Sequence, residues 1–425
     1  MVRPNFLLFF PDQHRGDWMP YDDQILKIIQ IEKLPIRMPN IEKIMHRGTS
    51  FYRCISPSPL CAPARACLAS GNRYENCHVP GNEYDYPAEK ESFYRVLRDN
   101  GYIVGGVGKF DIHKATFYWD NGWIDDLGRL GFTTAIDSEG KWATINSFKR
   151  DPVGPKGPYM KYLQDRGLME SHISDFEMRR KNGKFCSVPT PLPDEAYGDT
   201  WTGTNGIEML HNFPKDKPWF LQVNFPGPHD PWDVTLNMKK RWENVIFPAA
   251  ERGKPEDTMA LNGVRQNYAA MLENIDTQIG LLLNEVENRG ESDNTIIIYS
   301  SDHGEMLGDK NLFGKHLPDK GSIHIPLVFS GPGINKNYTT GALTELTDLS
   351  ASILDYAGIT NKFQDSISLM PVLKGETQEH RETIQSALAD WKVIIDKHYK
   401  SIFKNGKIQQ KFDAVNDPWE RNNLI

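Results

Sequence analysis

Short apolar runs that alternate with helical segments restrict the fold of this chain more than any other feature of its sequence. Residues 6–10 form an apolar run between two prolines, and residues 219–225 and 295–300 are similarly short and rich in β-branched or aromatic side chains. Helical patterns lie between such runs, the longest at residues 264–288. This alternation is typical of βαβ units, in which helices cover a mostly parallel sheet. The sequence therefore predicts an α/β fold with one large mixed, mostly parallel sheet flanked by helices.

Two parts of the chain depart from that alternation. Residues 114–215 are rich in Gly, Pro, Trp and charged side chains and show little periodicity, which indicates a long insertion that shapes the binding pocket. Beyond Gly375, short alternating runs follow one another, and Asn405-Gly406 separates two of them, which is typical of a β-hairpin. We therefore expect a main domain at residues 1–374 and a small C-terminal antiparallel subdomain at residues 375–425.

Charge and hydropathy exclude several classes of partner. The net charge is -7, from 49 basic and 56 acidic residues, which argues against nucleic acid or an anionic membrane as partner. No apolar run is long enough to span a membrane. The N-terminal apolar run is too short for a signal peptide, so we expect a cytoplasmic protein, or a periplasmic or secreted one if a signal has been removed.

Polar clusters follow two of the predicted strands. Asp12 and Gln13 come directly after residues 6–10, and Asp302 and His303 come directly after residues 295–300. The carboxyl ends of parallel strands meet at the ligand-binding edge of such a sheet. Carboxylate and amide oxygens are ligands for hard cations. The four side chains therefore predict one divalent metal site, with Ca²⁺ preferred and Mn²⁺ possible because one ligand is an imidazole.

Cys61 differs from the other cysteines in its surroundings. The chain has five cysteines in a spacing that fits no zinc site. Cys61 precedes a run of small residues with helical character, and Arg65 lies one turn further on. A cysteine at a helix N-terminus beside a cation has a lowered pKa and is reactive.

Cys61, Pro63 and Arg65 match the Cys-X-Pro-X-Arg signature, so the chain resembles the type I sulfatases of the alkaline phosphatase superfamily. The resemblance implies an alkaline-phosphatase-like fold with residues 1–374 as the catalytic domain. It also implies that Cys61 is oxidised to formylglycine, whose hydrated aldehyde is the nucleophile. Such a modification requires a formylglycine-generating or anaerobic sulfatase-maturing enzyme as partner.

Other motifs extend the resemblance to most of the chain. Gly108-Lys109, Pro228-His229 and Gly314-Lys315 resemble elements of the same family. The resemblance implies that Lys109 and Lys315 bind sulfate oxygens and that His229 protonates the leaving group. Arg65 is expected to fix the nucleophile.

Several positions depart from the family pattern. Asp111 stands where the family has a histidine, so His113 is expected to supply the base, with Asp111 orienting it or a substrate hydroxyl. Gln13 and His303 also differ from the usual sulfatase residues at their positions, and both changes resemble the phosphonate monoester hydrolase branch. Asn82 is either a substrate contact or a turn residue. The remaining substrate-binding candidate is His316.

The predicted activity is release of sulfate from a small-molecule or oligosaccharide sulfate ester, with a sulfated carbohydrate preferred. A phosphonate monoester or phosphodiester hydrolase is the alternative, and an inactive sulfoglycan-binding protein is the third possibility. The predicted insertion offers aromatic and basic side chains for a sulfated sugar, unless they form a solvated loop: Trp119, Trp123, Trp142, Trp201, Lys141, Lys149, Arg150, Lys156 and Lys161.

Overall fold

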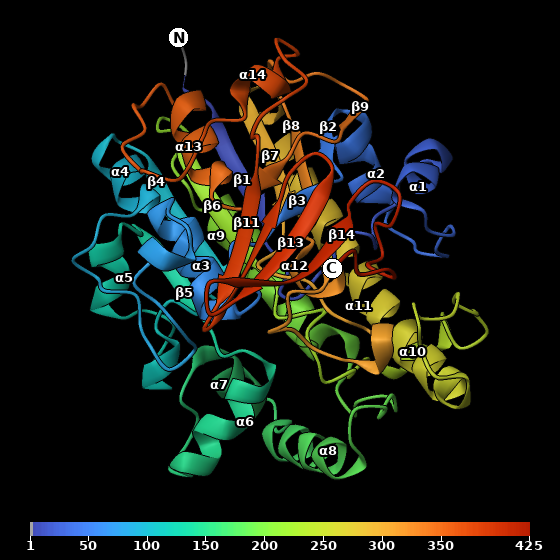
Figure 1. The fold of residues 1–425 in the computed structure, drawn as a ribbon. Helices are drawn as coiled ribbons and strands as arrows, with labels where there is room; N and C mark the ends of the chain where they lie inside the picture. The colour runs from blue at the N-terminus through green and yellow to red at the C-terminus, as the bar shows by residue number, and fades with distance from the viewer. Residues whose placement is uncertain (1–2) are drawn as a thin grey trace.

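The computed structural model describes residues 3–425 and is built around an eight-stranded sheet (Figure 1). In spatial order its strands are β5 (Thr134–Asp137), β4 (Ile103–Gly108), β6 (Trp219–Asn224), β1 (Asn5–Phe9), β7 (Thr295–Ser300), β8 (Leu327–Ser330), β2 (Gly48–Phe51) and β9 (Tyr338–Thr340). The strands from β5 to β7 are parallel, whereas β8 runs antiparallel to both β7 and β2. The predicted mixed, mostly parallel sheet is confirmed.

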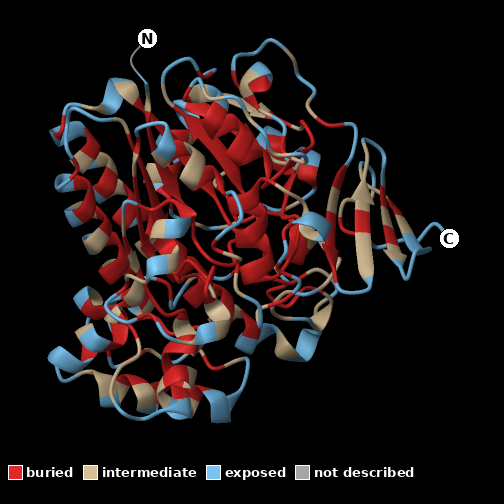
Figure 2. Ribbon diagram, turned by 90° about the vertical axis from the view of Figure 1, so that its left-hand side faces the viewer, coloured by how far each residue is buried: buried red, intermediate tan, exposed pale blue. Residues whose placement is uncertain are grey.

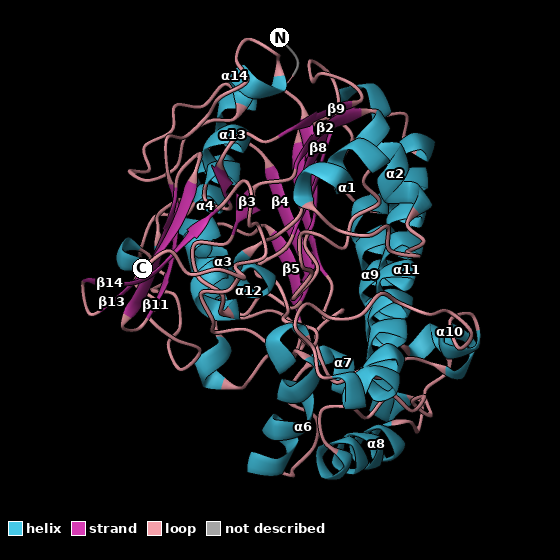
Figure 3. Ribbon diagram, turned by 45° about the vertical axis from the view of Figure 1, so that its right-hand side comes forward, coloured by secondary structure: helices cyan, strands magenta, loops and turns pink. Residues whose placement is uncertain are grey.

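Helices cover both faces of this sheet (Figure 3). They are α1 (Asp23–Ile29), α2 (Pro39–His46), α3 (Cys61–Ser70), α4 (Phe93–Asp99), α5 (Asp125–Leu130), α6 (Lys141–Arg150), α7 (Pro158–Asp165), α8 (Met169–Asn182), α9 (Gly198–His211), α10 (Leu236–Lys240), α11 (Thr258–Asn288), α12 (Lys320–Ile323), α13 (Asp348–Tyr356) and α14 (Met370–Leu373). Helices α3, α4 and α13 contribute to the core on one face, and α2, α9 and α11 to the core on the other. No helix of residues 3–425 combines the length and apolar character needed to cross a membrane.

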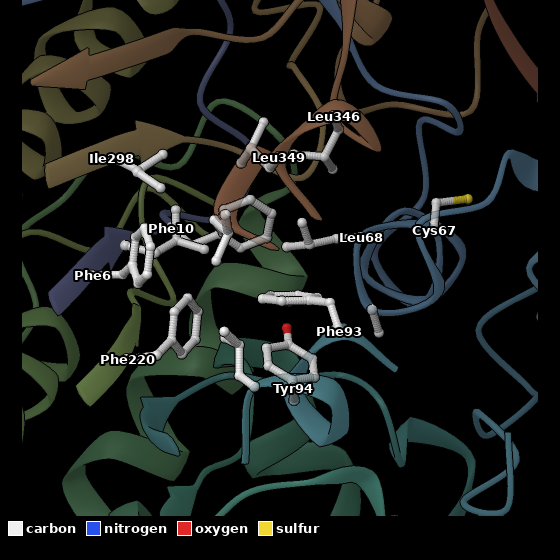
Figure 4. Packing of buried hydrophobic residues seen from close by; sticks show 14 of the residues in the cluster. Phe6, Phe10, Cys67, Leu68, Phe93, Tyr94, Phe220, Ile298, Leu346 and Leu349 are labelled. Atoms are coloured by element: carbon white, nitrogen blue, oxygen red, sulfur yellow. The ribbon is translucent and has the colours of Figure 1, made fainter. Parts of the chain in front are cut away.

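The central strand β1 is apolar at every position after Asn5 because both of its faces are buried. Alternate side chains point to opposite faces of a strand. Phe6 therefore packs with Leu68 and Phe93 from α3 and α4 (Figure 4), whereas Leu7 joins the core beneath α11. This burial anchors the strand whose end carries Asp12.

Residues 114–215 do not form one insertion, contrary to the prediction. Strand β5 pairs with β4 as an edge of the main sheet, and α9 packs against α11 and the sheet. Only α6, α7 and α8 form a group beyond the end of the sheet (Figure 1). Four-residue strands such as β5 have too few residues to show a period, which explains why the sequence did not reveal it.

The C-terminal residues form an antiparallel sheet of β11 (Ile384–Leu388), β12 (Trp391–Ile395), β13 (Tyr399–Lys404) and β14 (Lys407–Asp413). Asn405 and Gly406 connect β13 to β14, both with positive φ, as the Asn-Gly pair predicts. The sheet packs on β3 (Cys54–Ile55) and α12, while its other side is mostly half-buried or exposed (Figure 2). Strand β3 itself pairs with β10 (Thr344–Glu345).

Candidate active site

The predicted site residues come together where the parallel strands end. Asp12 follows β1, Lys109 follows β4, His229 lies in the loop after β6, and Asp302 follows β7. These strands are neighbours in the sheet, so their carboxyl ends bring the four side chains to one edge. Asp12, Lys109 and Asp302 are almost completely buried.

Cys61 is the first residue of α3 and faces this edge. Its Sγ lies 3.0 Å from Nζ of Lys315, 3.6 Å from Nζ of Lys109 and 3.2 Å from Nε2 of His303. The thiol is buried. Burial alone would raise its pKa, but Lys109, Lys114 and Lys315 outweigh burial and hold the pKa of Cys61 well below its ordinary value. The surroundings are therefore built for an anion.

Asp12, Cys61, Asp302 and His303 offer ligand atoms that lie within 4.8 Å of one another. His303 donates from Nδ1 to the carbonyl of Gly304 at 3.0 Å, which leaves the lone pair of Nε2 facing the site. Two carboxylates and an imidazole with this tautomer fit a divalent cation. Burial and Cys61 act to raise the pKa of Asp12, but the opposing effect of Lys109 and Lys315 is larger. The pKa of Asp12 is therefore below its ordinary value, and its carboxylate is charged.

Gln13 lies at the border of this group. Its backbone N–H donates to Oδ1 of Asp302 at 2.9 Å, and its Oε1 accepts from Nζ of Lys315 at 2.8 Å. Its Nε2 donates to the buried carboxylate of Glu305. Glu305 thereby fixes which end of the amide faces Lys315 and the metal candidates. Glu305 was not predicted from the sequence, although it belongs to the same loop as His303.

Arg65 compensates the two buried carboxylates. Its Nε donates to Oδ2 of Asp302 at 3.0 Å, and its Nη2 donates to Oδ2 of Asp12 at 3.2 Å. It also reaches Oδ1 of Asn224 at 3.3 Å. Asn224, the last residue of β6, was not predicted, although a polar residue ending a buried strand was a usable signal. Arg65 thus acts on the negative side chains of the site and does not contact Cys61 in the hydrogen-bond network of residues 3–425.

His229 connects Lys315 to a neighbouring carboxylate. Its Nε2 lies 2.8 Å from Nζ of Lys315, and its Nδ1 lies 3.1 Å from Oδ1 of Asp230. Asp230 in turn accepts from Nε1 of Trp142 at 2.7 Å. Burial and Lys315 lower the pKa of His229, but Asp230 and Asp12 outweigh them and raise it to about 9.

The other predicted residues lie at the edges of the site. Oδ1 of Asn82 accepts from the backbone N–H of Ala62 at 3.0 Å, so Asn82 positions the first turn of α3. Asp111 binds Lys109 and Lys114. Lys114 belongs to no motif in the sequence and was therefore not predicted.

The two remaining histidines have different environments. His113 is buried, which lowers its pKa, and its Nε2 has no hydrogen-bond partner among residues 3–425. No hydrogen bond in that part of the chain joins His113 to Cys61. His316 is exposed, and its backbone N–H donates to Pro59 at 3.2 Å.

Most of the predicted sugar-binding side chains have other roles. Trp119 and Trp201 are buried, and Trp123 packs on the main core, so only Trp142 lies near His229. The basic candidates are engaged as well: Lys141 pairs with Asp233, Lys149 with Glu177, Lys156 with Asp151 and Lys161 with Asp165, while Arg150 stacks on Phe117. Trp119 and Trp201 therefore belong to the core, the basic candidates contact neighbouring side chains, and Trp142 lies beside Asp230 and His229.

Comparison with known proteins agrees with this geometry. The sequence model of the family described as Sulfatase matches residues 4–359. The chain belongs to the sulfatase family. The arylsulfatase of Clostridium perfringens (strain 13 / Type A) is 24% identical over 458 residues, which cover 100% of this chain and 90% of the relative. This family member is thus an enzyme of the sulfatase type, as predicted.

Solved structures share the fold of this sulfatase family member. The phosphonate monoester hydrolase of Agrobacterium radiobacter superposes with a TM-score of 0.78 at 22% identity, covering 99% of this chain and 91% of that one. A protein solved in complex with its substrate D-glucosamine-2-N,6-O-disulfate superposes with a TM-score of 0.76 at 19% identity, covering 100% of this chain and 93% of that one. These similarities confirm the alkaline-phosphatase-like fold.

Proposed function

We propose that this chain is a sulfuric ester hydrolase that releases sulfate from a sulfated carbohydrate, with residues 1–374 as its catalytic domain. The observation that supports this most is the position of Cys61 between two ammonium groups. Its Sγ lies 3.0 Å from Nζ of Lys315 and 3.6 Å from Nζ of Lys109. Sulfate oxygens bound at this point meet fixed positive charges, which stabilise the negative charge of the transition state.

The nucleophile in this proposal is formylglycine made from Cys61 by a formylglycine-generating or anaerobic sulfatase-maturing enzyme. When present, the modified side chain supplies a hydroxyl as nucleophile, which a thiol cannot supply. Asn82 holds the backbone beside residue 61 through the N–H of Ala62. Arg65 neutralises Asp12 and Asp302 and so keeps the surrounding charges balanced.

Asp12, Gln13, Asp302 and His303 are the proposed ligands of a divalent metal, Ca²⁺ before Mn²⁺. A metal held by these residues would supply positive charge against the sulfate group. In this structure Lys109 binds Asp12, which places its ammonium group beside the proposed ligands.

His229 is the proposed proton donor to the leaving oxygen. Asp230 and Asp12 raise its pKa to about 9, and Asp230 lies 3.1 Å from its Nδ1, which orients the ring. His113, with its unpartnered Nε2, is the proposed base for release of sulfate. Asp111 positions Lys109 through their ion pair, and His316 is a proposed substrate contact at the exposed rim.

The second candidate is a phosphonate monoester hydrolase, which Gln13 and His303 favour as departures from the sulfatase pattern. A comparison of kcat/KM for sulfated sugars, p-nitrophenyl sulfate and a phenylphosphonate ester separates the two. We expect sulfate release to be fastest. A clear preference for the phosphonate ester would reverse the assignment, and hydrolysis of none of these by fully converted protein would indicate the binding protein.

A further inference from the structure

A cavity of about 430 Å³ opens beside His229 and Lys315. It is lined by Asp230 and Gly314, which are the chain neighbours of these two residues, together with aromatic and basic side chains from α6, from the end of α8 and from the loops that follow β6 and β7. The main ones are Trp142, Arg180, Lys184, Trp232 and Phe313. A cavity with aromatic walls and few polar groups is the usual form of a small-ligand site.

The wall of this cavity is joined to the proposed proton donor. Nε1 of Trp142 donates to Oδ2 of Asp230 at 2.7 Å, and Oδ1 of Asp230 lies 3.1 Å from Nδ1 of His229. Since His229 delivers its proton to the leaving oxygen, the alcohol that carries this oxygen must lie on the side of His229. The cavity lies next to Asp230, on the side of His229 that this carboxylate contacts.

The side chains that line the cavity carry more positive than paired negative charge. Nε of Arg179 is paired with Asp175 at 2.9 Å, and Asp230 is paired with His229. Arg180 and Lys184 are exposed, and within residues 3–425 neither forms an ion pair with a carboxylate. Two positive groups at the mouth of the cavity thus remain available to an anion.

Aromatic rings hold these two cations in place. The guanidinium of Arg180 lies 5.3 Å from the ring centroid of Trp142, and Nζ of Lys184 lies 4.9 Å from that of Phe313. The backbone of Lys184 is fixed as well, because its carbonyl accepts from Nε1 of Trp232 at 2.8 Å. Each of the two cations therefore lies beside an aromatic side chain of the cavity lining.

We propose that this cavity binds the sugar of the leaving group and that Arg180 and Lys184 select a sugar bearing a second anionic group besides the sulfate ester that is cleaved. The inference rests on the proposed function and adds the substrate class to it. The ring of Trp142 packs against the sugar and, through Asp230, couples an occupied cavity to the orientation of His229. A cationic leaving group such as choline is disfavoured, since two positive charges would repel it.

Catalysis provides the first test. The probes are glucosamine-2-N,6-O-disulfate, glucosamine-6-O-sulfate and p-nitrophenyl sulfate, measured with protein in which residue 61 is converted. Wild type should prefer the disulfated to the monosulfated sugar by at least about tenfold in kcat/KM, the size of one favourable charged contact. In Arg180→Gln/Lys184→Gln this preference should fall to near unity, while p-nitrophenyl sulfate hydrolysis changes far less. Arg180→Lys/Lys184→Arg should restore the preference.

A matched control is Arg166→Gln. Arg166 is also an exposed arginine stacked on an aromatic ring, that of Tyr162, but it does not line the cavity. The Arg166→Gln variant should keep the wild-type preference. Equal hydrolysis of the two sugars by wild type, or an undiminished preference in Arg180→Gln/Lys184→Gln, overturns the proposal.

Binding provides a test that does not depend on turnover. Calorimetric titration of Cys61→Ser protein with glucosamine-2-N,6-O-disulfate should give a Kd at least about tenfold lower than in the same protein carrying Arg180→Gln/Lys184→Gln. The difference should shrink at high ionic strength, because these charges are exposed. Equal Kd values for the two Cys61→Ser proteins contradict the cavity assignment, even if no sulfate ester is cleaved. If the sugar binds but the converted protein hydrolyses no sulfate ester, only the proposed enzymatic function is contradicted.

Discussion

Nε2 of His229 lies 2.8 Å from Nζ of Lys315, and the same Nζ lies 3.0 Å from Sγ of Cys61. At this separation only one hydrogen can lie between the two nitrogens, so His229 and Lys315 hold protons as one unit. Sulfate oxygens that attract the ammonium of Lys315 would free Nε2 of His229 to face the leaving oxygen. The contact therefore links binding of the sulfate group to the protonation of the leaving group.

Replacement of His229 should be most harmful for poor leaving groups. In His229→Gln, kcat/KM for a sugar sulfate should fall by about 10²–10⁴-fold, the typical contribution of a general acid. The loss for p-nitrophenyl sulfate should be much smaller, since a nitrophenolate departs without a proton. Equal losses on both substrates would show that His229 binds sulfate instead of donating a proton.

The pH profile should have an alkaline limb set by His229. The proton-donating form is lost as pH rises through its pKa of about 9, so kcat/KM for a sugar sulfate should decline above that value. Asp230 raises this pKa, so Asp230→Asn should move the limb to lower pH. An unchanged limb in Asp230→Asn would assign it to another group.

Metal binding should stabilise the folded protein. Free Ca²⁺ at about 100 times its Kd should add about 2.7 kcal/mol to the free energy of unfolding and raise Tm, which differential scanning fluorimetry measures. Asp302→Asn should remove this response and abolish turnover. Asp99→Asn, at the exposed end of α4, is the matched control and should respond as wild type does. A full Ca²⁺ response in Asp302→Asn would refute the ligand set.

Activity should follow the conversion of residue 61. Mass spectrometry of the peptide containing Cys61 gives the converted fraction, and kcat per total protein should rise in proportion to it when a maturing enzyme is co-expressed. Cys61→Ala should be inactive but fold normally, because the side chain is small and lies at the start of α3. Full activity of entirely unconverted protein would sink the formylglycine mechanism.

Gly140 should be required for the position of Lys109. A Cβ at Gly140 would lie 2.6 Å from Cε of Lys109, so Gly140→Ala must displace that side chain. A shift of about 1 Å can cost about 10²-fold in rate, and we expect a loss of that order in kcat. Gly198→Ala is the matched control at the start of α9, since its Cβ would meet its nearest neighbour at an ordinary 3.5 Å. Similar kcat values for the two variants would argue against a catalytic position for Lys109.

The sequence by itself determined the central strands of the main sheet and the polar residues that follow them. Continuous apolar runs such as residues 6–10 can only be buried on both faces, so polar residues such as Asp12 at their ends must lie at one edge of the sheet. The signature around Cys61 is local, because its residues belong to the first turns of a single helix. The signature can therefore be recognised from a few consecutive positions of the chain.

Only the tertiary structure decided which charged and aromatic side chains remain available. Trp142 and Asp230 are 88 positions apart, and no local pattern predicts their hydrogen bond. Lys141 and Lys156 resemble Lys184 in the sequence, yet carboxylates pair with the first two and not, within residues 3–425, with the third. Ion pairing depends on which segments the fold brings within about 4 Å. The polar residues of the candidate site were therefore visible in the sequence, whereas the contacts around the cavity depend on packing between distant segments.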